Sequence, residues 1–365
     1  MKTFVICLLA VASAHLAHAC TSMIISAEAS LDGRPILWKH RDTSASDNYL
    51  YRVDRPGEIG YVALFNGGDS LCFDEAWMGL NDRGFAIMNT VAYNLPENSP
   101  EYTDREGVVM AEALASCVTV DDFGQMLDRL PKPLGVRTNF GVMDAAGNGA
   151  YFETDDYTYE RFDLSDTPSG VLIRTNFAYS GQPDTGMGYI RHANVEKILA
   201  EEIASGTITP ASLTEGLSRS FYNSLTGFDA SDSGERWAVD QDFIPRHSST
   251  ASIAIEGLLP GEPPSQAVIW ANLGYPPCSH VVAATLDSIP VAALPADSLG
   301  ARCALAIDAA ERKMEAFPVD RGSGQRYIDL DAVRNISEEQ YGISLEEYAK
   351  AAALRANIKK KHSNK

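Results

Sequence analysis

Cys20 is the residue in this sequence best placed to do chemistry, because it directly follows an apolar leader. The leader carries Lys2 near its start, an apolar stretch over 4–14, and the small-x-small triplet Ala17-His18-Ala19, as is typical of a cleaved signal peptide. Cleavage after Ala19 would place a thiol and a free α-amine on the same residue. The usual pKa values are about 8.5 for a thiol and about 7.7–8.0 for an α-amine, so the amine can act as the base. We therefore predict a signal peptide over 1–19, export to the periplasm or the extracellular space, and a nucleophilic Cys20.

Such a nucleophile needs an acceptor that holds its amine, donors for a tetrahedral oxyanion, and a positive group near the thiolate. Asp42 is the candidate acceptor, because a hairpin with its turn at Asp32-Gly33 brings it back to the chain start. Asn89 and Asn176 stand at the ends of apolar strands, where a side-chain amide can serve an oxyanion. An ordinary strand-end asparagine is the alternative for each.

Composition limits the function classes. The chain of 365 residues has 45% hydrophobic residues, enough for a large core, and a net charge of −19. So acidic a chain is a poor partner for nucleic acid or an anionic membrane, and no segment after the leader is apolar enough to span a bilayer. Of the six cysteines, five follow the leader, and this odd number leaves at least one free thiol. No Cys/His cluster has metal spacing, so we predict neither a metal nor another cofactor.

The order of predicted elements suits one layered domain with two sheets. We expect strands over 21–26, 35–39, 61–65, 72–78, 85–88, 139–144, 149–154, 158–162, 171–175, 250–255, 267–271 and 281–284. We expect helices over 107–117, 120–130, 189–204 and 214–222. Thr119 or Asp121 begins the second helix, and prolines end it. The catalytic domain would span 20–298, with a helical segment over 299–365 packed on it.

Several motifs in the chain resemble one family when they are taken in order. The set comprises Cys20-Thr21-Ser22, Asp32-Gly33, Lys39-His40-Arg41-Asp42, a Gly-Leu-Asn-Asp-Arg-Gly-Phe turn over 79–85, an Asn-Phe-Gly-Val-Met-Asp stretch over 139–144, Thr175-Asn176, Arg246-His247, and a Trp-Ala-Asn-Leu-Gly stretch over 270–274. This set is similar to the N-terminal-nucleophile hydrolases of the choloylglycine hydrolase and penicillin acyltransferase kind. The resemblance covers about residues 20–290.

The resemblance implies an α+β fold, a four-layer αββα sandwich of two antiparallel sheets flanked by helices. It implies that Cys20 is nucleophile and base, that Asp42 holds the amine, and that Arg246 stabilises the charged site. Asn176 would donate its side-chain amide to the oxyanion, and the backbone at Asn89 or Thr90 would supply the other donor.

Lys39 stands where the bile-salt enzymes of this family have an arginine. Because a lysine cannot form the planar two-pronged contact of an arginine, this difference weakens a bile-salt assignment. The resemblance implies a hydrolase that acts on carbon–nitrogen bonds in linear, non-peptide amides through a Cys20 thioester, with acyl transfer as a competing outcome. Its partner would be a small N-acyl amide, and a homo-oligomer is compatible with the sequence.

Three alternatives remain open. Cys20 could carry a lipid anchor, although the large polar His18 stands where small residues are expected. Cys20 could instead pair in a disulfide of a binding or structural protein. A related family of N-terminal-cysteine peptidases also begins Cys-Thr, so the reaction could be dipeptide cleavage.

Overall fold

The computed structural model of the protein describes residues 19–68, 73–100, 104–297, 302–320 and 326–363. The predicted signal peptide lies outside these residues except for Ala19, as does Cys72. The predicted domain boundary near 298 also falls in an undescribed segment. No helix in the described ranges is both long and apolar enough to cross a membrane.

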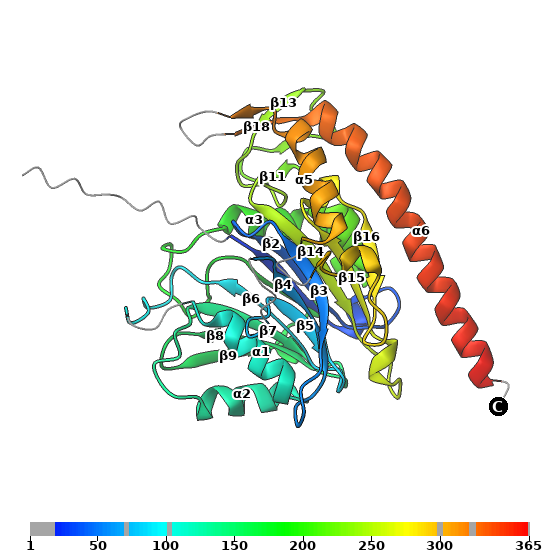
Figure 1. The fold of residues 1–365 in the computed structure, drawn as a ribbon. Helices are drawn as coiled ribbons and strands as arrows, with labels where there is room; N and C mark the ends of the chain where they lie inside the picture. Colours follow the sequence, from blue (N-terminus) through cyan, green and yellow to red (C-terminus); the bar gives the residue numbers. More distant parts are fainter. Residues whose placement is uncertain (1–18, 69–72, 101–103, 298–301, 321–325, 364–365) are drawn as a thin grey trace, which may run out of the picture.

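Two antiparallel sheets make the centre of the molecule (Figure 1). The six-stranded sheet has the order β10 (Val171–Arg174), β1 (Thr21–Ile25), β2 (Ile36–Asp42), β14 (Ser249–Glu256), β15 (Val268–Leu273) and β16 (Val281–Ala284). The seven-stranded sheet follows chain order through β3 (Asn48–Val53), β4 (Tyr61–Asn66), β5 (Met78–Asn81), β6 (Ala86–Val91), β7 (Thr138–Met143), β8 (Gly149–Thr154) and β9 (Tyr159–Asp163).

The sheets pack face to face because alternate residues along each strand are apolar toward the partner sheet. Ile24 of β1 and Leu37 of β2 are fully buried in the same core as Phe140 of β7. Their neighbours Met23 and Trp38 point the other way, into a second core. The side chains of β1 therefore alternate between the inter-sheet layer and an outer helical layer.

Helices cover both outer faces (Figure 1). On the seven-stranded sheet, Phe123 of α2 packs edge-on against Phe152 of β8, with ring centroids 5.1 Å apart. On the six-stranded sheet, Tyr348 of the last helix packs on Trp270 of β15 at 4.5 Å. The helices are α1 (Glu106–Ser116), α2 (Val120–Arg129), α3 (Tyr189–Ile198), α4 (Ala200–Ser205), α5 (Ala304–Ala316) and α6 (Leu330–Ser363). The predicted α+β class with four αββα layers is confirmed.

Short strands join the C-terminal segment to the rest of the chain. β18 (Arg326–Asp329) pairs with both β13 (Trp237–Val239) and β17 (Val319–Asp320). A separate hairpin consists of β11 (Tyr222–Asn223) and β12 (Phe228–Asp229).

Two predicted elements need correction, and one strand was missed. The strand expected over 72–78 begins only at Met78, because the Trp77 N–H bonds to Leu64 O and the Ala76 N–H to Gly107 O, outside any ladder. The helix expected over 214–222 consists of a π-turn and a 3₁₀-turn between Ser212 and Arg219. Strand β3 was not predicted. The start of α2 is as expected, since Thr119 and Asp122 form a capping box.

Candidate active site

Cys20 directly precedes β1, which lies between β10 and β2 in the six-stranded sheet. Cys20 and Ser22 are two residues apart, so their side chains point to the same face of the sheet. The Ser22 hydroxyl lies 2.8 Å from the Tyr151 hydroxyl of the opposite sheet. The Cys20 thiol therefore belongs to the inter-sheet layer. It lies 3.9 Å from the backbone oxygen of Asp42. In this structure the Cys20 nitrogen is part of the peptide bond to Ala19, and both residues are buried.

The first hairpin brings Asp42 to Cys20, as predicted. β1 and β2 pair with Thr21 opposite His40 and Ser22 opposite Lys39, so the end of β2 reaches the start of β1. The Asp42 side chain is buried and points away from the inter-sheet layer, where it accepts a hydrogen bond from Ser249 Oγ at 2.5 Å. Arg246 Nη2 forms an ion pair with its other carboxylate oxygen.

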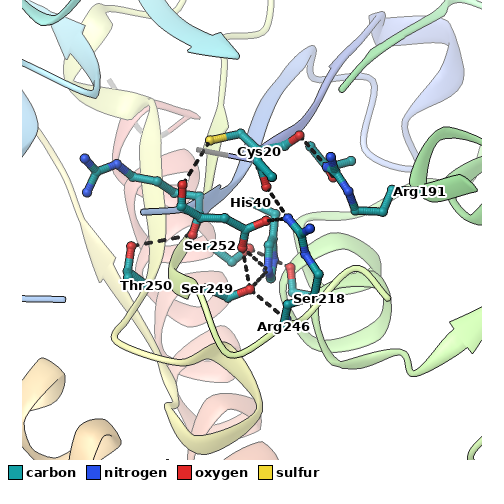
Figure 2. A network of polar contacts seen from close by, with 12 residues as sticks. Cys20, His40, Arg191, Ser218, Arg246, Ser249, Thr250 and Ser252 are labelled. Carbon is teal, nitrogen blue, oxygen red and sulfur yellow. Dashed lines mark hydrogen bonds and ion pairs between the residues drawn. The ribbon is translucent and has the colours of Figure 1, made fainter. Parts of the chain in front are cut away.

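A β-bulge explains how Ser249 reaches Asp42. The register between β2 and β14 shifts between Ser249 and Ala251, and Ser249 then pairs opposite Asp42. Such a bulge re-aims a side chain at the end of a ladder. Figure 2 shows Ser249, Arg246 and His40 converging on one polar network beside Cys20.

The hydrogen-bond directions in this network fix the state of His40. Burial lowers the pKa of His40 to about 4, so its ring is neutral at physiological pH. Its Nε2 lies 2.8 Å from Ser249 Oγ, which also accepts a bond from the Arg246 backbone N–H at 2.9 Å. Because the single hydroxyl proton of Ser249 goes to Asp42, His40 must donate from Nε2. The result is a chain of donors from His40 through Ser249 to the Asp42 carboxylate.

Arg246 connects Asp42 to Ala19, the residue before Cys20. Its Nη2 donates to the Ala19 carbonyl oxygen at 2.6 Å and to the Asp42 carboxylate. Burial works against the charge of Arg246, but the ion pair with Asp42 outweighs it and raises the pKa of the guanidinium. The positive group expected near Cys20 is therefore beside it, bonded to Asp42.

Arg191, to which the sequence assigned no role, links the Asn176 side chain to the Cys20 backbone. Arg191 of α3 donates from Nη1 to Cys20 O at 2.6 Å and from Nη2 to Asn176 Oδ1 at 2.6 Å. The Asn176 amide nitrogen donates to Val91 O at 2.8 Å. Figure 2 shows that Arg191 and Arg246 approach Cys20 from different directions.

Lys39 and Asn89 contact each other across the inter-sheet layer. Lys39 Nζ donates to Asn89 Oδ1 at 2.7 Å and to Trp77 O at 3.0 Å. Burial lowers the pKa of Lys39 to about 8, and the nearby Cys20 sulfur opposes this shift. The Asn89 amide nitrogen donates to Thr138 Oγ1 at 3.2 Å, so the side chain is tied into the seven-stranded sheet. Asn89 and Thr90 pair with Phe140 and Asn139 of β7.

Arg191, His40 and Ser249 are site residues for which the sequence predicted no role. The sequence contained a signal for Arg191, because it falls four residues before Val195 and eight before Leu199, on the apolar face of α3. A charged residue on that face indicates a buried polar contact. His40 and Ser249 carried no comparable signal, since their contact depends on how β2 meets β14.

Three other cysteines are described besides Cys20. Cys20, Cys117, Cys278 and Cys303 are all free in the described part of the chain. Burial raises the pKa of Cys117 and Cys303 to about 11 and that of Cys278 to about 12, which makes these three thiols poor nucleophiles. Within the described ranges, no group of three or more His, Cys, Asp or Glu side chains could hold a metal ion.

A surface hollow of about 1260 Å³ lies at the far end of β1, not at Cys20. It is lined by residues such as Ser26, Glu28, Asp144 and Gly170. Because Cys20 and Ser26 lie beyond opposite ends of a five-residue strand, with a rise of about 3.3 Å per residue, the hollow is distant from the thiol. It is therefore separate from the candidate site.

Comparisons with known proteins give the following matches. No family model and no curated protein matches the chain. Among solved structures, it is similar to a conjugated bile acid hydrolase from Clostridium perfringens, with 11% identity, a TM-score of 0.46, and coverage of 74% of this chain and 93% of that one. It is similar to a Caenorhabditis elegans ortholog of N-acylethanolamine-hydrolyzing acid amidase, with 13% identity, a TM-score of 0.41, and coverage of 66% and 94%. It is also similar to penicillin V acylase from Agrobacterium tumefaciens, with 12% identity, a TM-score of 0.39, and coverage of 74% and 87%.

Proposed function

We propose that this protein is an exported N-terminal-cysteine hydrolase that cleaves a linear N-acyl amide through a Cys20 thioester. The observation that carries the proposal is the Asp42 carboxylate, which Arg246 and Ser249 hold next to the Ala19–Cys20 peptide bond. Once Ala19 is removed, the nitrogen of Cys20 would be a free amine close to this carboxylate, and Arg246 would lose its bond to the Ala19 carbonyl oxygen.

The proposed reaction has two halves. The α-amine of Cys20 takes the thiol proton, and the sulfur attacks the amide carbon to form a tetrahedral oxyanion. The carbon–nitrogen bond then breaks, the protonated α-amine gives its proton to the leaving nitrogen, and the acyl group remains on sulfur as a thioester. Water, or a second amine, attacks the thioester in the same way and regenerates the thiol.

The surrounding residues have distinct proposed roles. Asp42 orients the α-amine through its charge, and the His40–Ser249 donors fix the carboxylate. Asn176 contributes its side-chain amide to the oxyanion, and the backbone at Asn89 or Thr90 supplies a second donor. Arg246 and Lys39 provide positive charge near the thiolate. Arg191 bonds both Asn176 Oδ1 and the Cys20 carbonyl oxygen, which places the Asn176 side chain near Cys20, while its amide nitrogen donates to Val91 O.

Cys20→Ala is the direct test. The exported protein is purified and its N-terminus is read by intact mass spectrometry, with a free Cys20 amine as the expected result. Wild type, Cys20→Ala and Cys303→Ser are then assayed on N-acyl amino acids, N-acyl ethanolamides, penicillins, conjugated bile acids and dipeptides. Cys303 is a matched control because its sulfur caps α5, a position that serine fills well.

We expect Cys303→Ser to match wild type and Cys20→Ala to lose turnover without losing its fold. Amide cleavage that survives Cys20→Ala would refute the mechanism. A diacylglyceryl group on Cys20 would show a lipid anchor instead, and cleavage confined to dipeptides would favour the peptidase alternative.

A further inference from the structure

Arg41 is a buried cation in the same layer as the proposed nucleophile. On β2, Arg41 lies on the same face of the sheet as Leu37 and Lys39, and this face points toward the seven-stranded sheet. Its contacts agree with this direction. The guanidinium carbon lies 4.9 Å from the centroid of the Trp77 ring, and Nη1 donates to Asn48 Oδ1. Arg41 is only 4% exposed.

No carboxylate pairs with Arg41 among the described residues. A guanidinium carries five N–H donors, and its one hydrogen-bond partner there is the neutral amide of Asn48. The acid that acts on it electrostatically, Asp104, is exposed on an adjoining loop. Burial lowers the pKa of Arg41 to about 10, so the side chain remains charged at physiological pH.

Lys39 adds a second buried charge of the same kind. Its ammonium group donates to Asn89 Oδ1 and Trp77 O, both neutral oxygens, and Glu106 acts on it electrostatically without a hydrogen bond or ion pair among the described residues. Both cations act electrostatically on Cys20. Burying a charge without an opposite charge is costly, and Leu37 shows that this face of β2 also accepts an apolar residue. Groups held at such a cost are candidates for function.

We propose that Arg41, with Lys39 beside it, forms a subsite for a carboxylate group that the substrate carries close to its scissile amide. The inference rests on the proposed function and specifies its substrate class. The planar guanidinium, held against Trp77, suits two-pronged binding of a carboxylate. The carboxylate can lie on the acyl part or on the amine part of the substrate, so the experiment tests each separately.

The first measurement compares chromogenic amides in matched pairs. N-glutaryl and N-pentanoyl 4-nitroanilide differ in charge on the acyl side. N-pentanoyl 3-carboxy-4-nitroanilide and its uncharged parent differ on the amine side. For one of the two pairs we expect wild type to favour the anionic member in kcat/KM. In Arg41→Met the ratio of kcat/KM for the anionic member to kcat/KM for the neutral member should fall on the order of 10- to 100-fold. Arg41→Lys should keep part of this preference.

The second measurement does not depend on turnover. Cys20 is alkylated with iodoacetate, which is anionic, and with iodoacetamide, which is neutral, and the labelled residue is identified by mass spectrometry. Both alkylation rates are proportional to the fraction of Cys20 that is thiolate, so this fraction cancels in the ratio of the iodoacetate rate to the iodoacetamide rate. The ratio therefore reports the positive potential at the thiol and not the thiol pKa. We expect the ratio to fall at least tenfold in Arg41→Met. Arg302→Met is the control, because its side chain is 62% exposed and pairs with Asp47 on the surface.

The outcomes separate the subsite from the reaction. An unchanged alkylation ratio in a folded Arg41→Met, or failure of both reagents to label Cys20, would overturn the subsite. If Cys20-dependent cleavage of neutral amides persists in that case, the proposed function still stands. If the ratio depends on Arg41 but no amide is cleaved, the anion subsite stands and the proposed function fails.

Discussion

Ser249→Ala tests whether Asp42 is held for catalysis by its neighbours. The substitution removes two neutral hydrogen bonds, from His40 Nε2 and the Arg246 N–H, and one charge-assisted bond to Asp42. At about 1 kcal/mol for each neutral bond and about 1.5–3 kcal/mol for the charged one, the free energy of unfolding should fall by about 3.5–5 kcal/mol. Because the unfolding entropy is about 2.1 cal/mol/K per residue, Tm should fall by about 5–7 °C for 365 residues.

The effect on activity distinguishes a positioning residue from a merely structural one. Arg246 still binds Asp42 in the variant, but the carboxylate loses its second anchor. We expect kcat to fall about 10- to 100-fold while KM changes little, as measured on the amide that wild type cleaves fastest. Ser249→Thr keeps a hydroxyl and should recover most of the rate.

Ser252→Ala is the matched control on the same strand. Its hydroxyl accepts a bond from Trp38 Nε1 at 3.0 Å and lies 2.7 Å from Ser218 Oγ, without contacting Asp42. It should lose stability but keep its kcat. If Ser249→Ala kept kcat within twofold of wild type, or if Ser252→Ala lost as much activity, the assignment of Ser249 would be wrong.

Two further predictions concern Glu106 and Asn176. Burial raises the pKa of Glu106, the first residue of α1, to about 7. Its ionisation therefore destabilises the folded state as pH rises from about 4.5 to 7, by up to about 3 kcal/mol. Glu106→Gln should match wild type in urea denaturation at pH 4 and exceed it at pH 8; a variant no more stable at pH 8 would contradict this. Asn176→Ala should lose about 10²–10³ in rate if its amide belongs to the oxyanion hole. A loss under threefold in folded protein would remove it from that role, and urea denaturation checks the fold because Arg191 loses a partner.

The parts of the site that the sequence predicted depend on local geometry. The hairpin that returns Asp42 to Cys20 is fixed by two adjacent strands and one turn. Lys39 and Asn89 were each singled out for a separate reason, and in the structure they bond to each other. The interior strands were also largely predictable, because alternating apolar residues have to face a core.

The missed parts depend on contacts between distant segments. Ser249 reaches Asp42 across 207 positions of sequence, and only because of a one-residue bulge in β14. Arg191 bonds a backbone oxygen 171 positions away. Nothing in the local sequence fixes such register. The apolar residues over 72–78 likewise suggested a strand, but the backbone at Ala76 and Trp77 bonds across to other segments.

The hydrogen bond from Arg246 to Ala19 sets an order of events in the life of the protein. Ala19 and Cys20 are 5% and 6% exposed, and the Ala19 carbonyl is bonded by a side chain from late in the domain. A protease needs an accessible, extended segment, and this peptide bond becomes inaccessible once β14 and Arg246 dock against β2. If the leader is removed after Ala19, as the proposed function requires, that cleavage has to come before this docking. On the proposed mechanism, a molecule that folded before this cleavage would stay inactive, because the amine of Cys20 would remain inside a buried peptide bond.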